Sequence, residues 1–332
     1  MATAAQLKAL IQSHAEGDEE RFYTIAMQVA AQAARNGHTK FAQALRDLVD
    51  RSKIHIKSEA LKQQIKPIPL VQPRGELAGL LSVNYPKNRL ADMALDDLVC
   101  SRIKRVLTEQ HQRKRIHEHG YTPLRKLLLI GPPGTGKTMT AAVLSGELGL
   151  ALFTIQLDGL ITKYLGETAS KLRLIFDAIE ETRAVYFFDE FDALGGERTA
   201  KNEVGEIRRV LNSFLQFLEQ DESESLVIAA TNHPKLLDLA LFRRFDAVIE
   251  YVLPSPNIAE NVMRARLRLL DTSHIQWSSV LEATEGLSHA DLTRACEQAA
   301  KKAILAQRTY IETTELIDAL KELHPTRINR QV

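Results

Sequence analysis

Apolar residues form three short unbroken runs in the middle of the chain, at residues 127–130, 184–188 and 226–230. Runs of this length without polar alternation are typical of parallel strands that are covered on both faces. Between the first two runs, the apolar positions of residues 172–179 recur at helical spacing. The pattern therefore predicts an α/β fold, in which helices flank a parallel sheet.

Both ends of the chain carry helical patterns instead. Three amphipathic stretches within residues 1–56 predict a small helical bundle. Four of the eleven prolines fall in residues 57–89 and favour an extended linker, because proline blocks helix interiors and lacks a ladder donor. The predicted domains are an N-terminal helical domain at 1–56, a linker at 57–89, an α/β domain at 90–254 and a C-terminal helical lid at 255–332.

A glycine-rich octapeptide that ends in Lys-Thr comes directly after the first apolar run. Its glycines let backbone N–H groups close around phosphate oxygens, Lys137 supplies a cation to the terminal phosphates, and the Thr138 hydroxyl is a ligand for Mg²⁺. A helix that begins at or just before Thr138 would point its N-terminal dipole at the same phosphates. A surface turn could match the motif by chance, but the flanking strand and helix favour a nucleotide site. The residues predicted to bind ATP here are Gly131, Pro132, Pro133, Gly134, Thr135, Gly136, Lys137, Thr138 and Met139.

The second and third apolar runs end in polar side chains that suit phosphate chemistry. Asp189 and Glu190 follow the second run, at the carboxyl end where ligands bind in parallel sheets. We expect Asp189 to hold Mg²⁺ together with Thr138, and Glu190 to orient and polarise the attacking water. Asn232 follows the third run, and its neutral amide can bind the γ-phosphate or that water without adding charge. A solvated acidic turn is the alternative explanation for the two acids.

Two adjacent arginines, Arg243 and Arg244, lie between aromatic residues and precede the dipeptide Phe245-Asp246. A guanidinium that is supplied to a neighbouring subunit's ATP stabilises the charge of the transition state. An ordinary structural ion pair is the alternative explanation for either arginine. The pair is therefore a candidate for a catalytic contact between subunits.

In this order, the four segments resemble those of the AAA+ ATPases, and more narrowly the AAA group of protein-remodelling ATPases. The resemblance covers roughly residues 90–323. It implies that the octapeptide is the Walker A motif, that the two acids are the Walker B motif and that Asn232 is the sensor 1 residue. Arg243 and Arg244 become candidate arginine fingers. Typical members separate these two arginines by two residues, so their adjacency leaves the choice open; we favour Arg244 because it directly precedes the Phe-Asp pair.

The resemblance also implies residues for the base and for a protein substrate. Met93 and Ala94 lie in a stretch that resembles the entry segment beside adenine. Lys163, Tyr164 and Leu165 lie in a stretch that resembles the first pore loop, whose aromatic residue grips polypeptide without demanding a particular sequence. The alternative is a tyrosine that merely covers the adjacent helix.

Residues 286–292 resemble the G-x-S-G-A-D-L turn of the family's helical lid, with His289 in place of a glycine. Ser288 and Asp291 of this turn are predicted to form a capping box at the start of the following helix. No arginine occupies positions 288–290, so the sequence does not support a sensor 2 arginine there.

The composition indicates a reduced, intracellular protein. The chain has 332 residues, enough for more than one domain, and two scattered cysteines, too few for a disulfide scaffold. A formal net charge of +1 implies no general attraction to nucleic acid. No apolar run approaches the roughly 20 residues that span a bilayer. We therefore expect a cytoplasmic protein that binds neither membrane nor nucleic acid.

Together these patterns predict an Mg²⁺-dependent ATPase that forms a homo-oligomeric ring, by resemblance a hexamer, and remodels or threads protein substrates through a central pore. The N-terminal helical domain is expected to select the protein client or partner. One alternative is a regulatory ATP-dependent switch that controls a separately encoded partner, such as a peptidase, and that would not need Tyr164. Another is a nucleic-acid-associated loader, which would bind nucleic acid in a strongly salt-dependent way.

Overall fold

The computed structural model describes residues 75–160, 165–194, 203–236 and 239–324, together with positions 30, 33, 43 and 73. The chain divides into two compact units, Met1–Ile68 and Pro69–Val332. The helices and strands given below all belong to the second unit. The predicted N-terminal bundle at 1–56 lies outside the described residues, apart from the three isolated positions.

A six-stranded sheet forms the centre of the second unit, with the strand order β1-β3-β4-β5-β2-β6. Strands β2 to β6 are mutually parallel, whereas β1 pairs antiparallel with β3 at one edge. The predicted α/β fold is therefore confirmed, with the addition of one antiparallel edge strand. The strands are β1 Leu81–Asn84, β2 Lys126–Ile130, β3 Leu152–Ile155, β4 Val185–Phe188, β5 Leu226–Thr231 and β6 Ala247–Glu250.

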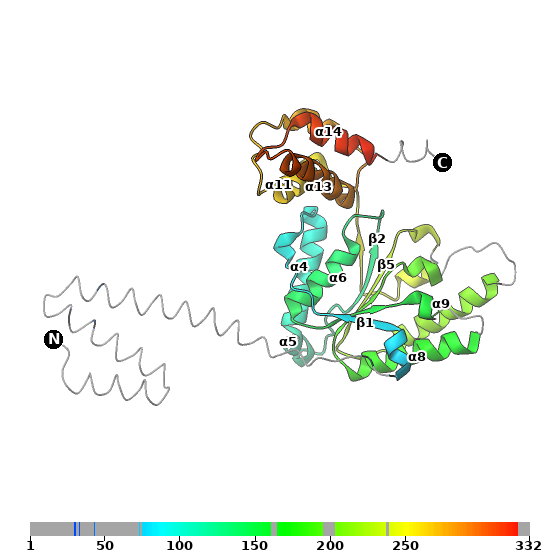
Figure 1. Ribbon diagram of the computed structural model, residues 1–332. Helices are drawn as coiled ribbons and strands as arrows, with labels where there is room; N and C mark the ends of the chain where they lie inside the picture. Colours follow the sequence, from blue (N-terminus) through cyan, green and yellow to red (C-terminus); the bar gives the residue numbers. More distant parts are fainter. Residues whose placement is uncertain are drawn as a thin grey trace. The chain divides into compact units, whose positions relative to one another are not determined.

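Helices cover both faces of this sheet (Figure 1). The α-helices are α4 Asp97–His111, α5 Arg113–Glu118, α6 Lys137–Leu148, α7 Leu157–Leu160, α8 Leu165–Glu181, α9 Glu203–Gln220 and α10 Leu239–Phe242, and the 3₁₀ helices are η1 Gly75–Gly79, η2 Leu90–Asp92, η3 Phe191–Leu194 and η4 Pro234–Leu236. Phe187 of β4 packs in one core with Leu144 of α6. Phe188 faces the other layer, with ring centroids 6.4 Å from Phe176 of α8 and 5.0 Å from Phe214 of α9. All four β4 residues are buried, which explains their unbroken apolar run.

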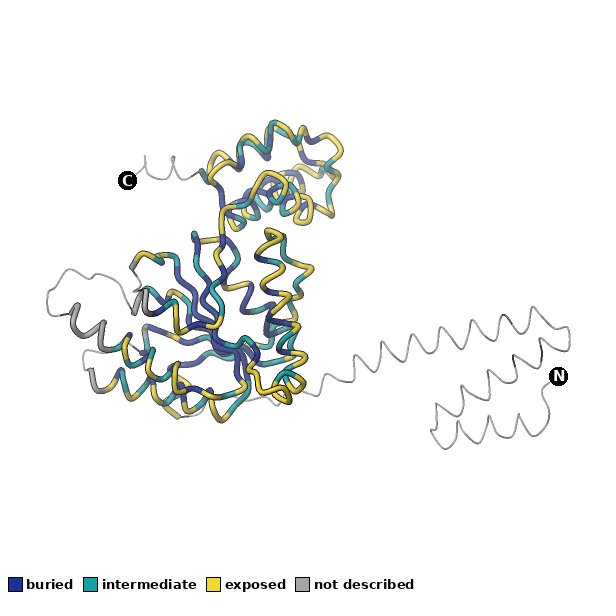
Figure 2. The backbone as a smooth tube through the Cα atoms, turned by 180° about the vertical axis from the view of Figure 1, so that it is seen from behind, coloured by how far each residue is buried: buried dark blue, intermediate teal, exposed yellow. Residues whose placement is uncertain are grey.

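The C-terminal helices form a second hydrophobic core of their own. They are α11 Pro256–Arg266, α12 Trp277–Glu282, α13 His289–Leu305 and α14 Thr313–Glu322. The predicted capping box is confirmed at the start of α13: Asp291 N donates to Ser288 Oγ at 3.3 Å, and Ser288 N donates to Asp291 Oδ2 at 3.1 Å. Figure 2 shows the burial that results, with the most continuous buried stretches in the central strands.

The segment predicted as an extended linker, 57–89, differs from that prediction in its second half. Residues 75–79 form η1, and β1 joins the sheet by pairing with β3. Leu80 and Leu81 are only 3% and 5% exposed, so this stretch is part of the folded unit. Pro73 and Pro86 flank the strand without interrupting it, which is why proline content alone led to the wrong assignment.

Candidate nucleotide site

The predicted site residues follow three neighbouring strands of the sheet. β4, β5 and β2 are adjacent and parallel, so their carboxyl ends share one edge, where ligands bind in such sheets. Gly131 follows β2, Asp189 follows β4 and Asn232 follows β5. Because β5 lies between β4 and β2, Asn232 follows a strand that separates the glycine-rich loop from the two acids.

The glycine-rich loop depends on glycine where it enters α6. Gly136 is the N-cap residue of α6, with a φ of 103°, a left-handed conformation that other residues rarely adopt. α6 begins at Lys137, and no side chain of the described residues caps it. Its first amides are therefore available to an anion, as at other phosphate-binding helix starts. Pro133, Gly134 and Thr138 are exposed along this edge, whereas Thr135 is buried.

Lys137 places a buried cation within the loop. The residue is only 6% exposed, and its Nζ donates to Gly131 O at 2.8 Å and to Pro132 O at 2.7 Å. Burial lowers the pKa of Lys137 below its ordinary value, while the charges of Asp189 and Asp192 act in the opposite direction. A buried ammonium is stable only with strong partners, and phosphate oxygens would supply more negative charge than the two carbonyls do.

Thr138 and Asp189 bring the two nucleotide motifs into direct contact, since Thr138 Oγ1 donates to Asp189 Oδ2 at 2.9 Å. A hydroxyl beside a carboxylate is a set of oxygen donors that fits Mg²⁺. Glu190 has a φ of 49°, and its N–H donates to Asp189 Oδ1 at 2.9 Å. Backbone strain at a residue other than glycine costs about 1–3 kcal/mol and clusters at functional sites.

Asp192 is a site residue that the sequence reasoning missed. Its Oδ1 accepts a hydrogen bond from Thr231 Oγ1 at 2.9 Å and another from Asn232 N at 3.3 Å. The carboxylate thus ties the end of β5 to η3, which directly follows the two acids. A signal was present in the sequence, because Asp192 lies only two positions after Glu190. We regard Asp192 as a positioning residue for Asn232.

The residues predicted beside adenine lie next to the same loop. Met93 Cε would be 3.2 Å from a Cβ built on Gly136, and Met93 Sδ lies 4.0 Å from Thr140 Oγ1 of α6. The Ala94 carbonyl oxygen lies 3.1 Å from Nε2 of His289, at the start of α13. Met139, also predicted to bind nucleotide, is 37% exposed on the first turn of α6.

The C-terminal helices contact the glycine-rich loop through their own main chain. Ala290 N donates to Gly134 O at 3.0 Å. The contact is close, because a Cβ added to Gly134 would be 2.4 Å from Ser288 Oγ. The turn at residues 288–290 therefore lies directly on the loop that is predicted to hold phosphate.

Arg243 and Arg244 lie at the opposite end of the sheet from the loop. They precede β6, which runs parallel to β2, so the start of β6 is one strand length from Gly131. At about 3.3 Å per residue, that length is roughly 13–17 Å for strands of this size. The structure therefore does not bring these two residues together with Lys137 in one subunit.

The segment that carries the arginines is nevertheless held firmly. Asp246 Oδ2 accepts from the backbone N–H groups of Arg125 and Lys126, each at 2.9 Å. Phe245 is buried, while both arginines are exposed. Arg244 forms an ion pair with Glu219 of α9.

The predicted pore-loop residues are almost entirely outside the described part of the chain. Lys163 and Tyr164 are not described, and of Leu165 only the backbone is, as the first residue of α8. The assignment of these residues to a pore loop therefore stays a prediction.

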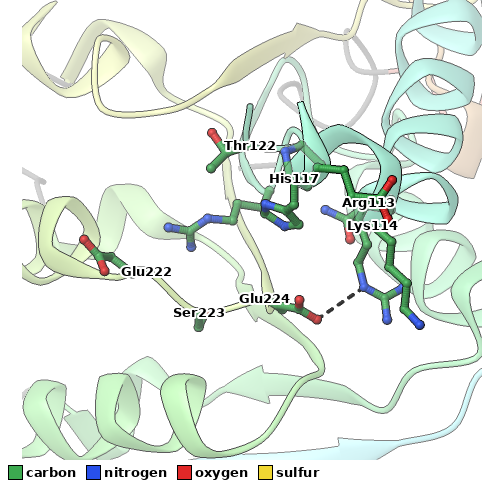
Figure 3. Close-up of a pocket in the computed structure, with 11 residues that line it drawn as sticks. Arg113, Lys114, His117, Thr122, Glu222, Ser223 and Glu224 are labelled. Carbon is green, nitrogen blue, oxygen red and sulfur yellow. Dashed lines mark hydrogen bonds and ion pairs between the residues drawn. The ribbon is translucent and has the colours of Figure 1, made fainter. Parts of the chain in front are cut away.

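A separate cavity of about 700 Å³ lies at the amino ends of β2 and β5, away from the glycine-rich loop. Figure 3 shows Arg113 of α5 reaching Glu224 across its wall, with Arg113 Nε and Glu224 Oε2 3.2 Å apart. Arg125, also in the lining, is paired with Asp221. Two of the arginines that line the cavity are therefore already engaged in ion pairs. Within the described ranges, no cluster of three or more His, Cys, Asp or Glu could hold a metal ion, and no helix is long and apolar enough to cross a membrane.

A strand, a glycine-rich loop and a helix, with Lys137 and Thr138 opposite Asp189, define a P-loop nucleoside-triphosphatase. The sequence model of the family described as "ATPase family associated with various cellular activities (AAA)" matches residues 127–253. The chain is 31% identical over 322 residues to the uncharacterized AAA family ATPase y4kL of Sinorhizobium fredii. The aligned region covers 97% of this chain and 96% of that protein. The chain therefore belongs to the AAA family, and it is an ATP-hydrolysing enzyme.

Two further relatives are longer proteins that match over the ATPase region. The chain is 34% identical over 214 residues to the proteasome-activating nucleotidase of Pyrococcus abyssi, which covers 62% of this chain and 54% of that protein. It is 34% identical over 205 residues to the ATP-dependent zinc metalloprotease FtsH 1 of Methylacidiphilum infernorum, covering 59% of this chain and 32% of that protein. The crystal structure of the FIGL-1 AAA domain superimposes with a TM-score of 0.61 and 23% identity over 80% of this chain and 96% of that one, which supports the fold alone.

Proposed function

We propose that this ATPase works as a homo-oligomeric ring, by resemblance a hexamer, in which an arginine of one subunit completes the nucleotide site of the next. The observation that carries the proposal is the position of Arg243 and Arg244 just before β6, one strand length from Gly131. A neighbouring subunit that places the amino ends of its strands beside the glycine-rich loop would bring a guanidinium to the phosphates. The exposure of both arginines leaves them accessible to such a neighbour.

Within one subunit, the residues divide the work of phosphoryl transfer. Lys137 and the first amides of α6 bind the phosphates, and Glu190 polarises the attacking water. Thr138 and Asp189 would hold Mg²⁺, which neutralises phosphate charge when it is bound. Asn232, positioned by Asp192, contacts the γ-phosphate or the water.

We further propose that ATP hydrolysis drives the remodelling or threading of a protein client. Two relatives support this, because the name proteasome-activating nucleotidase connects a nucleotidase with the proteasome, and the name ATP-dependent zinc metalloprotease connects ATP with a protease. The first of these names also supports a separately encoded peptidase as a partner. Lys163, Tyr164 and Leu165 would grip the client, the N-terminal helical domain would select it, and the two scattered cysteines suit action in the cytoplasm.

Subunit mixing tests the ring. Arg244→Ala and Lys137→Ala are each expected to lower ATP hydrolysis by about 10³-fold or more when assayed alone. Mixed together, they should recover part of the activity, because a Lys137→Ala subunit can lend its arginine to an intact site on an Arg244→Ala neighbour. The same mixture made with Arg243→Ala shows which arginine acts. If co-assembled mixtures stay inactive, the arginine does not act between subunits.

The threading proposal is tested with a reduced and alkylated polypeptide that cannot fold. It should raise the ATPase rate of the wild type and of Tyr164→Phe, whereas Tyr164→Ala should keep its basal ATPase rate and lose the increase. Tyr121→Ala is the matched control, because Tyr121 is a surface tyrosine with 72% exposure. Equal stimulation of Tyr164→Ala and wild type would contradict the pore loop and favour a regulatory switch.

A further inference from the structure

His289 joins the C-terminal helices to the segment beside the loop. It is the first residue of α13, and its Nε2 lies 3.1 Å from the carbonyl oxygen of Ala94, between η2 and α4. The lid turn that this sequence resembles has glycine at the same position. The imidazole is therefore a feature of this chain and needs a chemical explanation of its own.

The partner of Nε2 determines which ring nitrogen of His289 carries the proton. A backbone carbonyl can only accept a hydrogen bond, so Nε2 must be protonated and act as the donor to Ala94. Desolvation lowers the pKa of His289 below its ordinary value, although the bond to Ala94 acts in the opposite direction. The ring is thus neutral at neutral pH, and its Nδ1 presents a bare lone pair.

That lone pair is buried and accepts no hydrogen bond from the described residues. Nδ1 of His289 has no hydrogen-bond partner among the residues that the structure describes. Buried polar atoms are almost always paired, and an acceptor left alone in a poorly hydrated place is costly. The missing partner must be a hydrogen-bond donor.

His289 also lines a small cavity of about 100 Å³. The other walls come from the start of α4, the segment after β6 and α11, and they include the apolar residues Leu95, Val99, Pro254 and Ile258. Small-molecule sites typically combine mainly apolar walls with a few polar groups, which in this cavity come from Asp96, Tyr251, Ser255 and His289.

We propose that His289 reads the purine base of the bound nucleotide, with Nδ1 accepting a hydrogen bond from the exocyclic amine of adenine. Guanine carries a carbonyl oxygen in place of that amine, so two acceptors would face each other. A site that is built to pair with one polar group rejects the analogue that lacks it. The proposal rests on the ATPase activity and on Met93 and Ala94 as the base-binding segment, but not on ring assembly or on a protein client.

The test measures dissociation constants for ADP and GDP by isothermal titration calorimetry. The wild type should prefer ADP, and His289→Ala should reduce the ratio of the two constants about tenfold. His289→Gly, which restores the glycine of the resembling turn, should reduce it similarly. A merely structural role for His289 would weaken both nucleotides equally and leave the ratio unchanged.

His324→Ala is the matched control. His324 also places its Nε2 near a lid carbonyl, 3.0 Å from Glu285 O, and it does not line the cavity. This variant should keep the wild-type ratio. A wild type without preference for ADP, or an unchanged ratio in both His289 variants, would overturn the proposal. Because diphosphates bind without hydrolysis, neither outcome depends on threading or on the arginine between subunits.

Discussion

Replacing Asp192 tests how the end of β5 is held in place for catalysis. Asp192→Ala removes the acceptor of two hydrogen bonds, from Thr231 Oγ1 at 2.9 Å and from Asn232 N at 3.3 Å. It also removes a charge that raises the pKa of Lys137. Asp192→Asn keeps an acceptor oxygen and removes only the charge. The two variants therefore separate positioning from electrostatics.

The expected size of the effect follows from the two bonds that Asp192 accepts. A hydrogen bond to a charged group contributes about 1.5–3 kcal/mol. The bond from Asn232 is long, so we count it as weak and assign about 2 kcal/mol to the pair. If this free energy positions Asn232 in the transition state, kcat of Asp192→Ala falls about 30-fold, since each 1.36 kcal/mol changes a rate tenfold. Asp192→Asn should lose less than about tenfold on the same scale.

The assay is steady-state hydrolysis at saturating ATP, with the dissociation constant for ADP measured beside it. Because ADP lacks the γ-phosphate, displacement of Asn232 should lower kcat more than it weakens ADP binding. A folded Asp192→Ala that hydrolyses ATP at the wild-type rate would refute the reasoning. Equal losses in Asp192→Ala and Asp192→Asn would instead assign the effect to the charge near Lys137.

Three further predictions concern the same site. Glu190→Gln should still bind ATP but hydrolyse it about 10²-fold or more slowly, because an amide cannot take a proton; an unchanged rate would remove Glu190 from the chemistry. Gly134→Ala places a Cβ 2.4 Å from Ser288 Oγ at a φ of 74°, so ADP affinity should fall, whereas Gly79→Ala, which meets nothing within 4 Å, should match the wild type in the same titration. Affinity for ADP should also fall as the pH rises, beginning below 10.5, because burial lowers the pKa of Lys137 and the neutral amine no longer attracts phosphate. Lys137→Arg should abolish this decline, and affinity that is constant up to pH 10.5 would contradict it.

The central strands were predictable because their environment is the same on both faces. Leu127, Leu128 and Leu129 are fully buried, so no polar residue interrupts the run that marks β2. β1 was missed for the opposite reason. It has only four residues with mixed burial, and its conformation depends on pairing with β3, some seventy residues away, as Ser82 and Thr154 show.

The residues of the candidate site likewise include some that a local sequence pattern predicts and others that it does not. Lys137 and Thr138 could be assigned because a glycine-rich loop between strand and helix has a local sequence pattern. The contact of Asp192 with Asn232 spans 40 positions, and that of His289 with Ala94 spans 195. Neither contact follows a local pattern, so only the folded chain reveals them. Asp192, whose hydrogen bonds reach residues about 40 positions away, was therefore overlooked in the sequence.

The hydrogen bond from Ala290 N to Gly134 O has an evolutionary consequence. Its donor and acceptor are peptide groups, which every amino acid supplies, except that proline lacks the N–H. Side chains around the turn can therefore change during evolution without loss of this hydrogen bond between the C-terminal helices and the glycine-rich loop. Ala290→Pro is the one exchange at that position that would delete the donor.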